Sequence, residues 1–511
     1  MARWFVDRQP QQGIPSVSLR RLLPGARFVG CEDFEVSGCT ADSRRLDPGQ
    51  VFVAVRGDRH DGHAFVTQAM DRGAAGVVVE RPVPEAGRIQ VVVPDTRAAL
   101  ARLCQALAGD PSEQMLTLGV TGSCGRTVTA LFLRAIFEAA GGRYGLVGRL
   151  GWSDGAATRP AGAGVPGAEG LAGMLGEMVD RGCAGAVLEF DPEALRRRRV
   201  EGVSFDAAVV SDVASGPGLT ADAVVTRRGA MARLFRQVAP GGAAVVNADD
   251  PHAELLGAVN LDARRVAFGL NAGADVTARV ERLDRTGSRF RLRGFDREAT
   301  VGLRLIGVSS VSHALAAAAV AWSRGVGLDA VVAGLESVTG VPGRLDAVDE
   351  GQGFDVRVDQ AGDAAELHEA LSCLRATHPG GRVHCVFGAE GHGAGLGDAR
   401  AGRLALAAAA EAAADRLTVT TDNPRSEDPD RIVDDLLAGL TRPGRARVEP
   451  DRRLAIEAAL ADALPGDAVL IAGKGRQTFQ IFSDRALPFD DATVARSWLR
   501  AHKPGARRTS A

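Results

Sequence analysis

The stretch Leu116–Ala130, LTLGVTGSCGRTVTA, constrains the fold more than any other part of this 511-residue chain. Its apolar first half predicts a short strand, and its second half predicts the start of a helix. Gly122 and Gly125 lie between them and allow the backbone to wrap around an anion, to which the first turn of the helix offers unpaired N–H groups. This order of strand, glycine turn and helix is typical of a phosphate-binding loop and predicts an α/β protein.

The loop departs from the usual pattern at one position. A phosphate-binding loop ends Gly-Lys-Ser/Thr, whereas this one ends Gly125-Arg126-Thr127. Arginine keeps the positive charge of lysine but carries it on a wider planar group, so the replacement is not conservative in a tight site. We therefore expect Gly122, Gly125, Arg126 and Thr127 to form a nucleotide-binding loop with a changed cation. Cys124 lies near the helix N-terminus, a position that lowers the pKa of a thiol.

Alternating strand and helix patterns divide the chain into three α/β units, which we place at residues 1–112, 113–343 and 344–511. The middle unit predicts a doubly wound parallel sheet that carries the loop at the carboxyl end of a strand, where ligands bind in such sheets. Glu189 falls at the carboxyl end of another predicted strand, Ala186–Phe190, and Thr277–Leu292 predicts a short β insertion. The last unit predicts a second open sheet of the Rossmann-like α/β type.

The overall charge and the cysteines exclude several classes of protein. The formal net charge is −2, so no general positive field draws the chain to nucleic acid. No run of about 18 apolar residues predicts a membrane span. The seven cysteines are scattered without a CxxC spacing, which predicts reduced thiols rather than disulfides or a zinc site. Asp7, Arg8 and Pro10 stand where a secretory signal has its apolar core, so we expect a cytoplasmic protein.

Two polar clusters lie on predicted turns of the first unit, Asp42-Ser43-Arg44-Arg45 and Asp61-Gly62-His63. Taken alone, they are typical of turn chemistry, because Asp and Ser side chains close local hydrogen bonds. The run Arg196–Arg199 follows a predicted helix and is typical of a solvated helix end, where positive charge complements the helix dipole.

The order of the three units, the loop TGSCGRT and the segments VNADDP, GVPGR and DNPRSEDP together resemble the Mur ligases of peptidoglycan synthesis over about Val36–Leu499. The DNPR segment, Asp422–Arg425, is similar to that of the members that add meso-diaminopimelate as the third peptide residue. The resemblance implies a reaction in which ATP, with Mg²⁺, phosphorylates the carboxylate of a UDP-MurNAc-peptide. The amine of an amino acid then attacks the acyl phosphate, and phosphate leaves.

The resemblance assigns roles in the first and last units. Four residues match the family's UDP-binding segments without loss, which favours uridine contact over turn chemistry alone: Ser43, Arg44, Asp61 and His63. Four residues match the amino-acid clamp: Asp422, Asn423, Arg425 and Gly473. The usual His-Glu pair of the clamp reads Arg476-Gln477 here. A neutral glutamine grips an incoming ammonium group less well than a glutamate does.

The catalytic positions of the middle unit match less well. Thr127 and Glu189 stand where the family has magnesium ligands. An alignment without gaps places Pro217 at a metal-binding histidine and Met231 at a carbamoylated lysine that bridges the metal site. Proline has no ligand atom, and a thioether neither forms a carbamate nor suits a hard cation. Together with Arg126 at the loop lysine, three catalytic positions are degenerate.

Two functional hypotheses follow, and the residues favour the first. It is a catalytically impaired pseudo-ligase that binds the UDP-MurNAc-peptide and regulates or scaffolds other Mur ligases or cell-wall enzymes. Its basis is the contrast between an intact UDP site and an eroded catalytic cleft. The second is an active, divergent ATP-dependent diaminopimelate ligase, in which Arg126 replaces the lysine and Asp191 or Asp212 replaces Met231 as the bridge. A ligase or transferase with a different substrate is a third reading.

Overall fold

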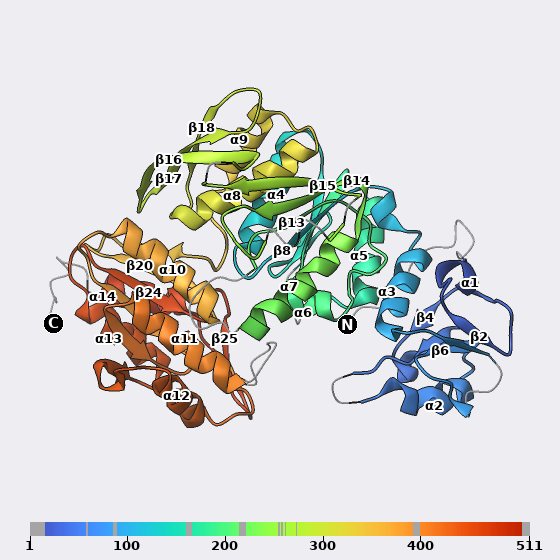
Figure 1. Cartoon of the computed structure of the whole chain (residues 1–511). Helices are drawn as coiled ribbons and strands as arrows, with labels where there is room; N and C mark the ends of the chain where they lie inside the picture. The colour runs from blue at the N-terminus through green and yellow to red at the C-terminus, as the bar shows by residue number, and fades with distance from the viewer. Residues whose placement is uncertain are drawn as a thin grey trace.

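In the part of the chain that the structure describes, three large sheets, each with its own helices, build the fold (Figure 1). The computed structural model describes residues 16–502 apart from 58–59, 85–88, 160–165, 214–220, 254–255, 257–258, 261, 272 and 392–398. Pro217, which the resemblance places at a metal-binding position, lies outside the described residues.

The first sheet has five strands in the order β2-β7-β6-β5-β4, and its neighbours are parallel except for β2 and β7. Runs of valine form its inner strands because β-branched side chains pack well on a buried, pleated surface. A small sheet of β1 and β3 lies beside it. The elements are β1 (Val17–Ser18), α1 (Leu19–Leu22), β2 (Arg27–Val29), β3 (Glu35–Val36), β4 (Cys39–Thr40), β5 (Val51–Val53), α2 (Val66–Asp71), β6 (Gly76–Val79), β7 (Gln90–Val92) and α3 (Thr96–Leu107).

The central sheet has eleven strands in the order β11-β10-β9-β12-β8-β13-β14-β15-β16-β17-β18. Strands β9 to β16 of this order are parallel, and the strands at both edges are antiparallel. The bounds are β8 (Leu116–Thr121), β9 (Tyr144–Gly148), β10 (Gly151–Ser153), β11 (Thr158–Arg159), β12 (Gly185–Glu189), β13 (Phe205–Val210), β14 (Val238–Asn247), β15 (Arg264–Gly269), β16 (Val276–Asp284), β17 (Gly287–Arg293) and β18 (Ala299–Leu303). The predicted β insertion is the antiparallel part, β16–β18.

Helices cover both faces of the central sheet. One core lies between the strands and α4, α8 and α9, and a second lies on the opposite face beneath α5, α6 and α7. The strands carry apolar residues on both faces, as a parallel sheet buried on both sides requires. This confirms the predicted doubly wound sheet. The helices are α4 (Arg126–Ala139), α5 (Ala168–Asp180), α6 (Pro192–Arg196), α7 (Ala221–Arg236), α8 (Val308–Ser323) and α9 (Leu328–Ser337).

The third sheet has six strands in the order β19-β20-β24-β21-β22-β23, all parallel except for β19 and β20. It confirms the predicted open α/β sheet. The elements are β19 (Asp346–Ala347), β20 (Asp355–Asp359), α10 (Ala364–Thr377), β21 (Val383–Phe387), α11 (Ala399–Ala413), β22 (Arg416–Val419), α12 (Pro429–Ala438), β23 (Ala446–Val448), α13 (Arg452–Asp462), β24 (Ala468–Ala472) and α14 (Asp491–Ala501), with a hairpin of β25 (Phe479–Ile481) and β26 (Ala486–Pro488).

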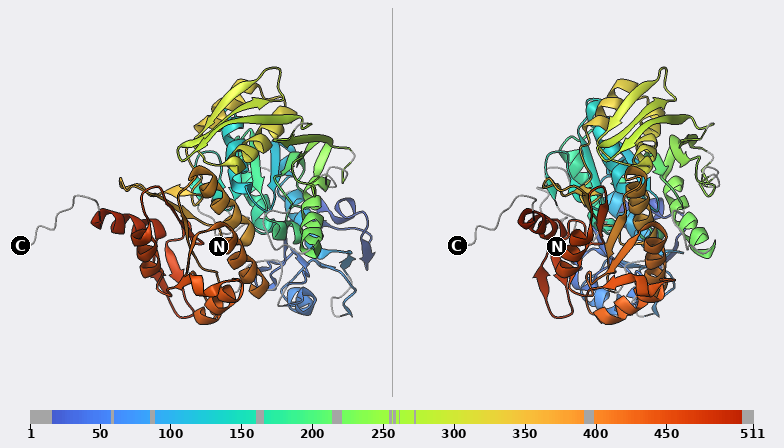
Figure 2. Two further views of the ribbon diagram at one scale, coloured as in Figure 1. Left: turned by 60° about the vertical axis from the view of Figure 1, so that its left-hand side comes forward. Right: turned by 90° about the vertical axis from the view of Figure 1, so that its left-hand side faces the viewer.

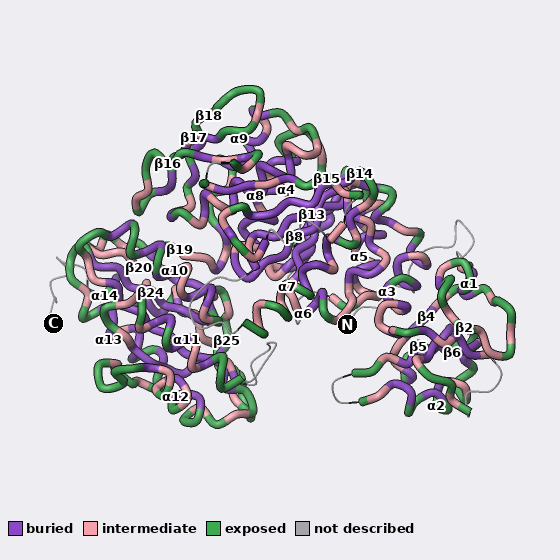
Figure 3. Tube along the Cα trace, in the orientation of Figure 1, coloured by how far each residue is buried: buried purple, intermediate pink, exposed green. Residues whose placement is uncertain are grey.

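The first and third sheets lie on different sides of the central one in Figure 1, and the β16–β18 extension lies at the top of both views in Figure 2. Buried residues follow the strands of each sheet, whereas exposed residues follow the turns and the outer helix faces (Figure 3). Among the described residues, none of the helices combines the length and the apolar character that a membrane span requires. The exact borders at residues 112 and 343 remain a prediction.

A buried ion pair holds the outer helices of the third sheet. Arg452 at the start of α13 donates to both carboxylate oxygens of Asp491 at the start of α14, at 2.8 and 2.7 Å. Both side chains are 0% exposed. Because neither charge reaches water, each depends on the other for compensation.

We predict that Asp491→Ala lowers the free energy of unfolding by about 3–5 kcal/mol, because it leaves the Arg452 charge buried without its partner. Urea denaturation followed by circular dichroism measures the change. The control is Asp484→Ala, which removes an exposed pair with Arg485 and should cost less than about 1 kcal/mol. Equal losses in the two variants would contradict the prediction.

Candidate functional site

The loop after β8 has the backbone that the sequence pattern predicts. Gly125 has a φ of +72° and directly precedes Arg126, the first residue of α4. A Cβ atom on Gly125 would lie 1.8 Å from Nε2 of His313. Only glycine fits here, because both the positive φ and the close approach of the imidazole exclude a side chain.

Arg126 turns back over the loop instead of extending from it. Its Nη1 donates hydrogen bonds to the backbone carbonyls of Gly122 and Ser123, and its side chain is 13% exposed. Its Nε lies 3.9 Å from Oε1 of Glu189, and its Nη2 lies 4.0 Å from Oε1 of Glu366. Burial lowers the pKa of Arg126, but the two carboxylates outweigh burial and raise it. Carbonyls and carboxylates of the protein itself therefore surround the loop cation.

Thr127 and Glu189, the two predicted magnesium ligands, lie side by side. Oγ1 of Thr127 donates to Oε1 of Glu189 at 2.8 Å, and the backbone N–H of Arg149 donates to Oε2 at 3.1 Å. Mg²⁺ prefers oxygen ligands and completes its shell with water and phosphate oxygens, so this pair fits one magnesium ion. Among the described residues, no group of three or more His, Cys, Asp or Glu side chains is arranged for a metal.

The position predicted to lack the bridging lysine is filled by core packing. Met231 lies on α7 with no exposed surface, among apolar side chains of the core beneath α5, α6 and α7. Asp191, one candidate to replace it, caps a helix instead: its Oδ1 accepts the N–H of Ala194 at 2.6 Å at the start of α6. Packing alone accounts for Met231.

Asp212, the other candidate, supports the loop backbone. Its Oδ1 accepts the N–H groups of Ser123 and Cys124, both at 2.9 Å. The expectation of a lowered pKa for Cys124 is wrong. Burial raises the pKa of this thiol well above its usual value, and the charges of Glu369 and Asp212 raise it further. A buried thiol among carboxylates is not a reactive one.

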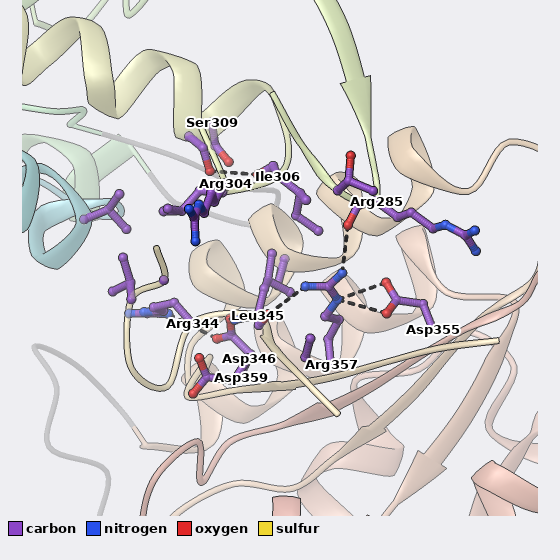
Figure 4. Close-up of a pocket in the computed structure, with 18 of the residues that line it drawn as sticks. Arg285, Arg304, Ile306, Ser309, Arg344, Leu345, Asp346, Asp355, Arg357 and Asp359 are labelled. Atoms are coloured by element: carbon purple, nitrogen blue, oxygen red, sulfur yellow. Dashed lines mark hydrogen bonds and ion pairs between the residues drawn. The ribbon is translucent and has the colours of Figure 1, made fainter. Parts of the chain in front are cut away.

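A cavity of about 670 Å³ lies between the loop, α8 and the start of the third sheet. Arg285 and Arg304 border it from the central sheet, and Arg344, Arg357 and Asp359 border it from the opposite side (Figure 4). Nη2 of Arg357 donates to the backbone carbonyl of Arg285 at 3.1 Å and so joins β20 to the turn between β16 and β17. The volume lies within the range of roughly 300–1,000 Å³ that small-molecule sites occupy.

Burial shifts the pKa of two side chains that line this cavity. It lowers the pKa of His313 to about 4, although the charge of Asp212 opposes the shift. It raises the pKa of Asp359 to about 6, although the charge of Arg344 opposes that shift. In both cases loss of hydration disfavours the charged form. At neutral pH His313 is therefore a neutral imidazole beside the loop.

The residues predicted to form the amino-acid clamp lie together near the carboxyl ends of β22 and β24. Nζ of Lys474 donates to Oδ1 of Asn423 at 2.9 Å and lies 3.7 Å from Oδ1 of Asp422. Gly473 has a φ of +114°, and a Cβ atom there would lie 2.6 Å from Oδ2 of Asp422. Arg425 adopts a left-handed φ of +55°, which is uncommon for a residue with a side chain. The structure brings all four predicted residues together.

Glu390 follows β21 and enters the clamp, although the residue pattern alone did not point to it. Its Oε1 accepts hydrogen bonds from Nε2 of Gln477 at 3.2 Å and from Nδ2 of Asn423 at 3.3 Å. Its Oε2 lies 3.2 Å from Nη2 of Arg425. A carboxylate therefore stands beside the neutral Gln477. The residue pattern also missed Glu366, which reaches the loop from α10, because nothing in the local sequence links positions 126 and 366.

The predicted UDP-binding residues make hydrogen bonds within the first unit. Oδ1 of Asp61 accepts both the backbone N–H and Nδ1 of His63, at 3.0 and 2.6 Å. Oγ of Ser43 donates to Oε1 of Gln68 at 2.6 Å. Ser43 and His63 are buried, whereas the side chain of Arg44 is 80% exposed. The Asp61–His63 bonds are turn chemistry, whereas the Ser43–Gln68 bond joins two separate elements of the first unit. Contact with uridine stays a prediction.

Three family models match successive parts of the chain. They are described as the Mur ligase family catalytic domain, over residues 35–107, the Mur ligase middle domain, over residues 120–321, and the Mur ligase glutamate ligase domain, over residues 343–475. The three matches follow one another in the order of the three sheets.

Relatives match over nearly the full length. The chain is 37% identical over 488 residues to a UDP-N-acetylmuramyl-tripeptide synthetase of Roseiflexus sp. (strain RS-1). The match covers 91% of this chain and 94% of that protein. The chain is also 34% identical over 493 residues to a UDP-N-acetylmuramoyl-L-alanyl-D-glutamate–2,6-diaminopimelate ligase of Geobacillus thermodenitrificans (strain NG80-2). This second match covers 95% of this chain and 99% of that protein.

Solved structures share the fold. A structure of UDP-N-acetylmuramoyl-L-alanyl-D-glutamate–2,6-diaminopimelate ligase has a TM-score of 0.65 at 25% identity and covers 95% of this chain and 99% of that one. A folylpolyglutamate synthase of Mycobacterium tuberculosis, complexed with ADP and AMPPCP, has a TM-score of 0.61 at 18% identity and covers 78% of this chain and 94% of that one.

We predict that the pKa of His313 makes the protein less stable in mild acid. The unfolded chain binds a proton at about pH 6.5, whereas the folded chain binds it only near pH 4, so stability rises with pH between these values. Between pH 7 and pH 5, the free energy of unfolding should fall by about 2 kcal/mol more in the wild type than in His313→Gln. Urea denaturation at both pH values measures the difference.

The control for this prediction is His502→Gln, which removes an exposed histidine at the end of α14. Asp359 has the opposite effect on the pH dependence, since its pKa is raised, but it is present in every variant and cancels in the comparison. A pH dependence that His313→Gln leaves unchanged would contradict the prediction.

Proposed function

Because this chain belongs to the Mur ligase family, we propose that it is an ATP-dependent ligase that joins meso-diaminopimelate to UDP-N-acetylmuramoyl-L-alanyl-D-glutamate in peptidoglycan precursor synthesis. The observation that carries the proposal is the full-length match to relatives named for this reaction. The adjacent Thr127 and Glu189 and the assembled clamp around Asn423 support it.

The residues of the cleft fit the parts of such a reaction. Thr127 and Glu189 would hold one magnesium ion, which neutralises the charge that gathers on the phosphates during transfer. Arg126 contributes the positive charge of the loop. The N–H groups at the start of α4 face the same place, where they stabilise negative charge.

The clamp orients the amino acid. Arg425 and Glu390 present opposite charges 3.2 Å apart, so a zwitterion meets a cation for its carboxylate and a carboxylate for its ammonium group. Lys474 is held by Asn423 and by the backbone carbonyl of Phe479 at 2.7 Å, which fixes the floor of the clamp. The clamp therefore holds the amine in one place relative to the cleft, and such positioning contributes to rate.

A second candidate function rests on a separate observation. Arg126 is turned back onto the loop carbonyls, and the position of the bridging lysine is taken by the fully buried Met231. Each change removes charge stabilisation from the reaction. These changes favour a catalytically impaired ligase that binds the UDP-MurNAc-peptide and regulates or scaffolds other cell-wall enzymes.

One assay separates the two functions. The purified full-length chain is incubated with ATP, Mg²⁺, UDP-MurNAc-dipeptide and meso-diaminopimelate, and phosphate and tripeptide are measured. We expect product at no more than roughly 0.01–0.1 s⁻¹, because an ordinary turnover of about 10 s⁻¹ falls by 10²–10³ for each charge contact that is lost. Thr127→Ala should abolish the product, which excludes a contaminating host enzyme.

We further predict that Arg126→Lys raises kcat about tenfold or more, since the lysine ammonium reaches phosphate as a compact point charge. The matched control is Arg134→Lys on α4, where the arginine pairs with Glu138 outside the cleft, and it should leave kcat unchanged. No product from the wild type and none from Arg126→Lys would remove the ligase proposal and leave the binding function.

A further inference from the structure

Arginines from three separate segments surround the carboxylate of Glu366. Its Oε1 accepts Nη2 of Arg344 at 2.5 Å and Nη1 of Arg149 at 2.8 Å, and it lies 4.0 Å from Nη2 of Arg126. The side chain of Glu366 is 3% exposed. Burial opposes its ionisation, but the charges of Arg344 and Arg149 outweigh burial and lower its pKa, so the carboxylate is ionised at neutral pH.

These arginines are the cations that a phosphate chain would meet. Arg126 is the cation of the phosphate-binding loop, and Arg149 follows β9 and donates its backbone N–H to Glu189. Arg344 borders the cavity beside the loop. Phosphates bind such a loop through its N–H groups and its cation. In this cleft one internal carboxylate already accepts hydrogen bonds from Arg344 and Arg149 and lies 4.0 Å from Arg126.

The donors of the loop are also engaged within the protein. Oδ1 of Asp212 accepts hydrogen bonds from the N–H groups of Ser123 and Cys124. Nη1 of Arg126 donates to the carbonyls of Gly122 and Ser123. This second observation is independent of Glu366, since Asp212 follows β13 in the central sheet. Both sets of contacts stabilise the loop without a bound anion.

Further carboxylates surround the same place. Asp363, which caps the N-terminus of α10, and Glu369 on α10 flank Glu366, and burial raises the pKa of both. Glu369 lies 3.8 Å from Nε2 of His313 beside the loop. Negative side chains concentrated near the loop oppose the approach of a polyphosphate, and they do so strongly because little water screens them.

We infer that Glu366 is a specificity-determining residue of the cleft, whose carboxylate competes with nucleotide phosphates for Arg126, Arg149 and Arg344. A nucleoside enters the cavity without disturbing these ion pairs. Each added phosphate either displaces the Glu366 carboxylate from the arginines or binds without a full ion pair of its own. The cleft of the wild type therefore gains little affinity from the phosphates of a nucleotide. The choice of adenine as the base rests on the proposed ligase function, but the competition does not require turnover.

The test compares adenosine, AMP, ADP and ATP, each titrated calorimetrically into the full-length chain with Mg²⁺. For the wild type we expect affinities that are flat or fall from adenosine to ATP. Glu366→Gln keeps the shape of the side chain and removes its charge. It should raise the affinity for ATP at least tenfold, the affinity for ADP by a smaller factor, and the affinity for adenosine by less than twofold. The matched control is Glu193→Gln, which removes a partly exposed carboxylate paired with Arg196 and Arg197 at the end of α6 and should leave all four affinities unchanged.

Each outcome decides the inference. An equal gain for adenosine and ATP in Glu366→Gln would indicate general opening of the cleft and overturn it, and so would the absence of a gain or the absence of all binding. If Glu366→Gln does not fold, the wild-type series decides alone: affinity that rises tenfold or more from adenosine to ATP overturns the inference. A chain without ligase activity still gives the binding result, so failure of the proposed function remains distinguishable.

Discussion

The charge balance around Arg126 is the constraint on which the cleft depends. A cation with a side chain that is 13% exposed has lost most of its hydration, and a buried charge without partners costs several kcal/mol. Glu189 and Glu366 supply carboxylates, and the loop supplies two carbonyls. The planar guanidinium reaches all of these at once, which the single ammonium group of lysine does not. Since Glu366 comes from α10, the same cation joins the central sheet to the third one.

The topology of the parallel sheets brings the functional residues together. The loop follows β8, Glu189 is the last residue of β12, and Asp212 follows β13; these three strands are neighbours in the central sheet. The clamp forms in the same way, because Glu390, Asn423 and Lys474 follow β21, β22 and β24 of the third sheet. Parallel strands end on one side of a sheet, so residues distant in the sequence meet at its carboxyl edge. The fold alone therefore places polar side chains at two adjoining sites.

Prediction from the sequence succeeded where the cause was local. Glycine at position 125, the apolar strand before it and the alternation of strands and helices each reflect neighbouring residues, and the structure contains the elements that they predict. It failed where burial decided the chemistry. Cys124 lies at a helix N-terminus, yet desolvation and nearby carboxylates raise its pKa. Asp212 appeared as a substitute for a catalytic lysine, but its carboxylate lies beneath the loop and holds backbone N–H groups.

The sequence by itself determined the fold class, the glycine loop between β8 and α4 and the absence of lysine from it, because hydrophobic periodicity and glycine turns act over a few residues. Only the tertiary structure decided which partners surround Arg126, that Met231 is buried, and that Glu366 and Glu390 enter the two sites. Ion pairs form between charges close in space, and their strength depends on the water that folding removes. Neither the distance from position 126 to position 366 nor their burial exists in the chain until the sheets have packed.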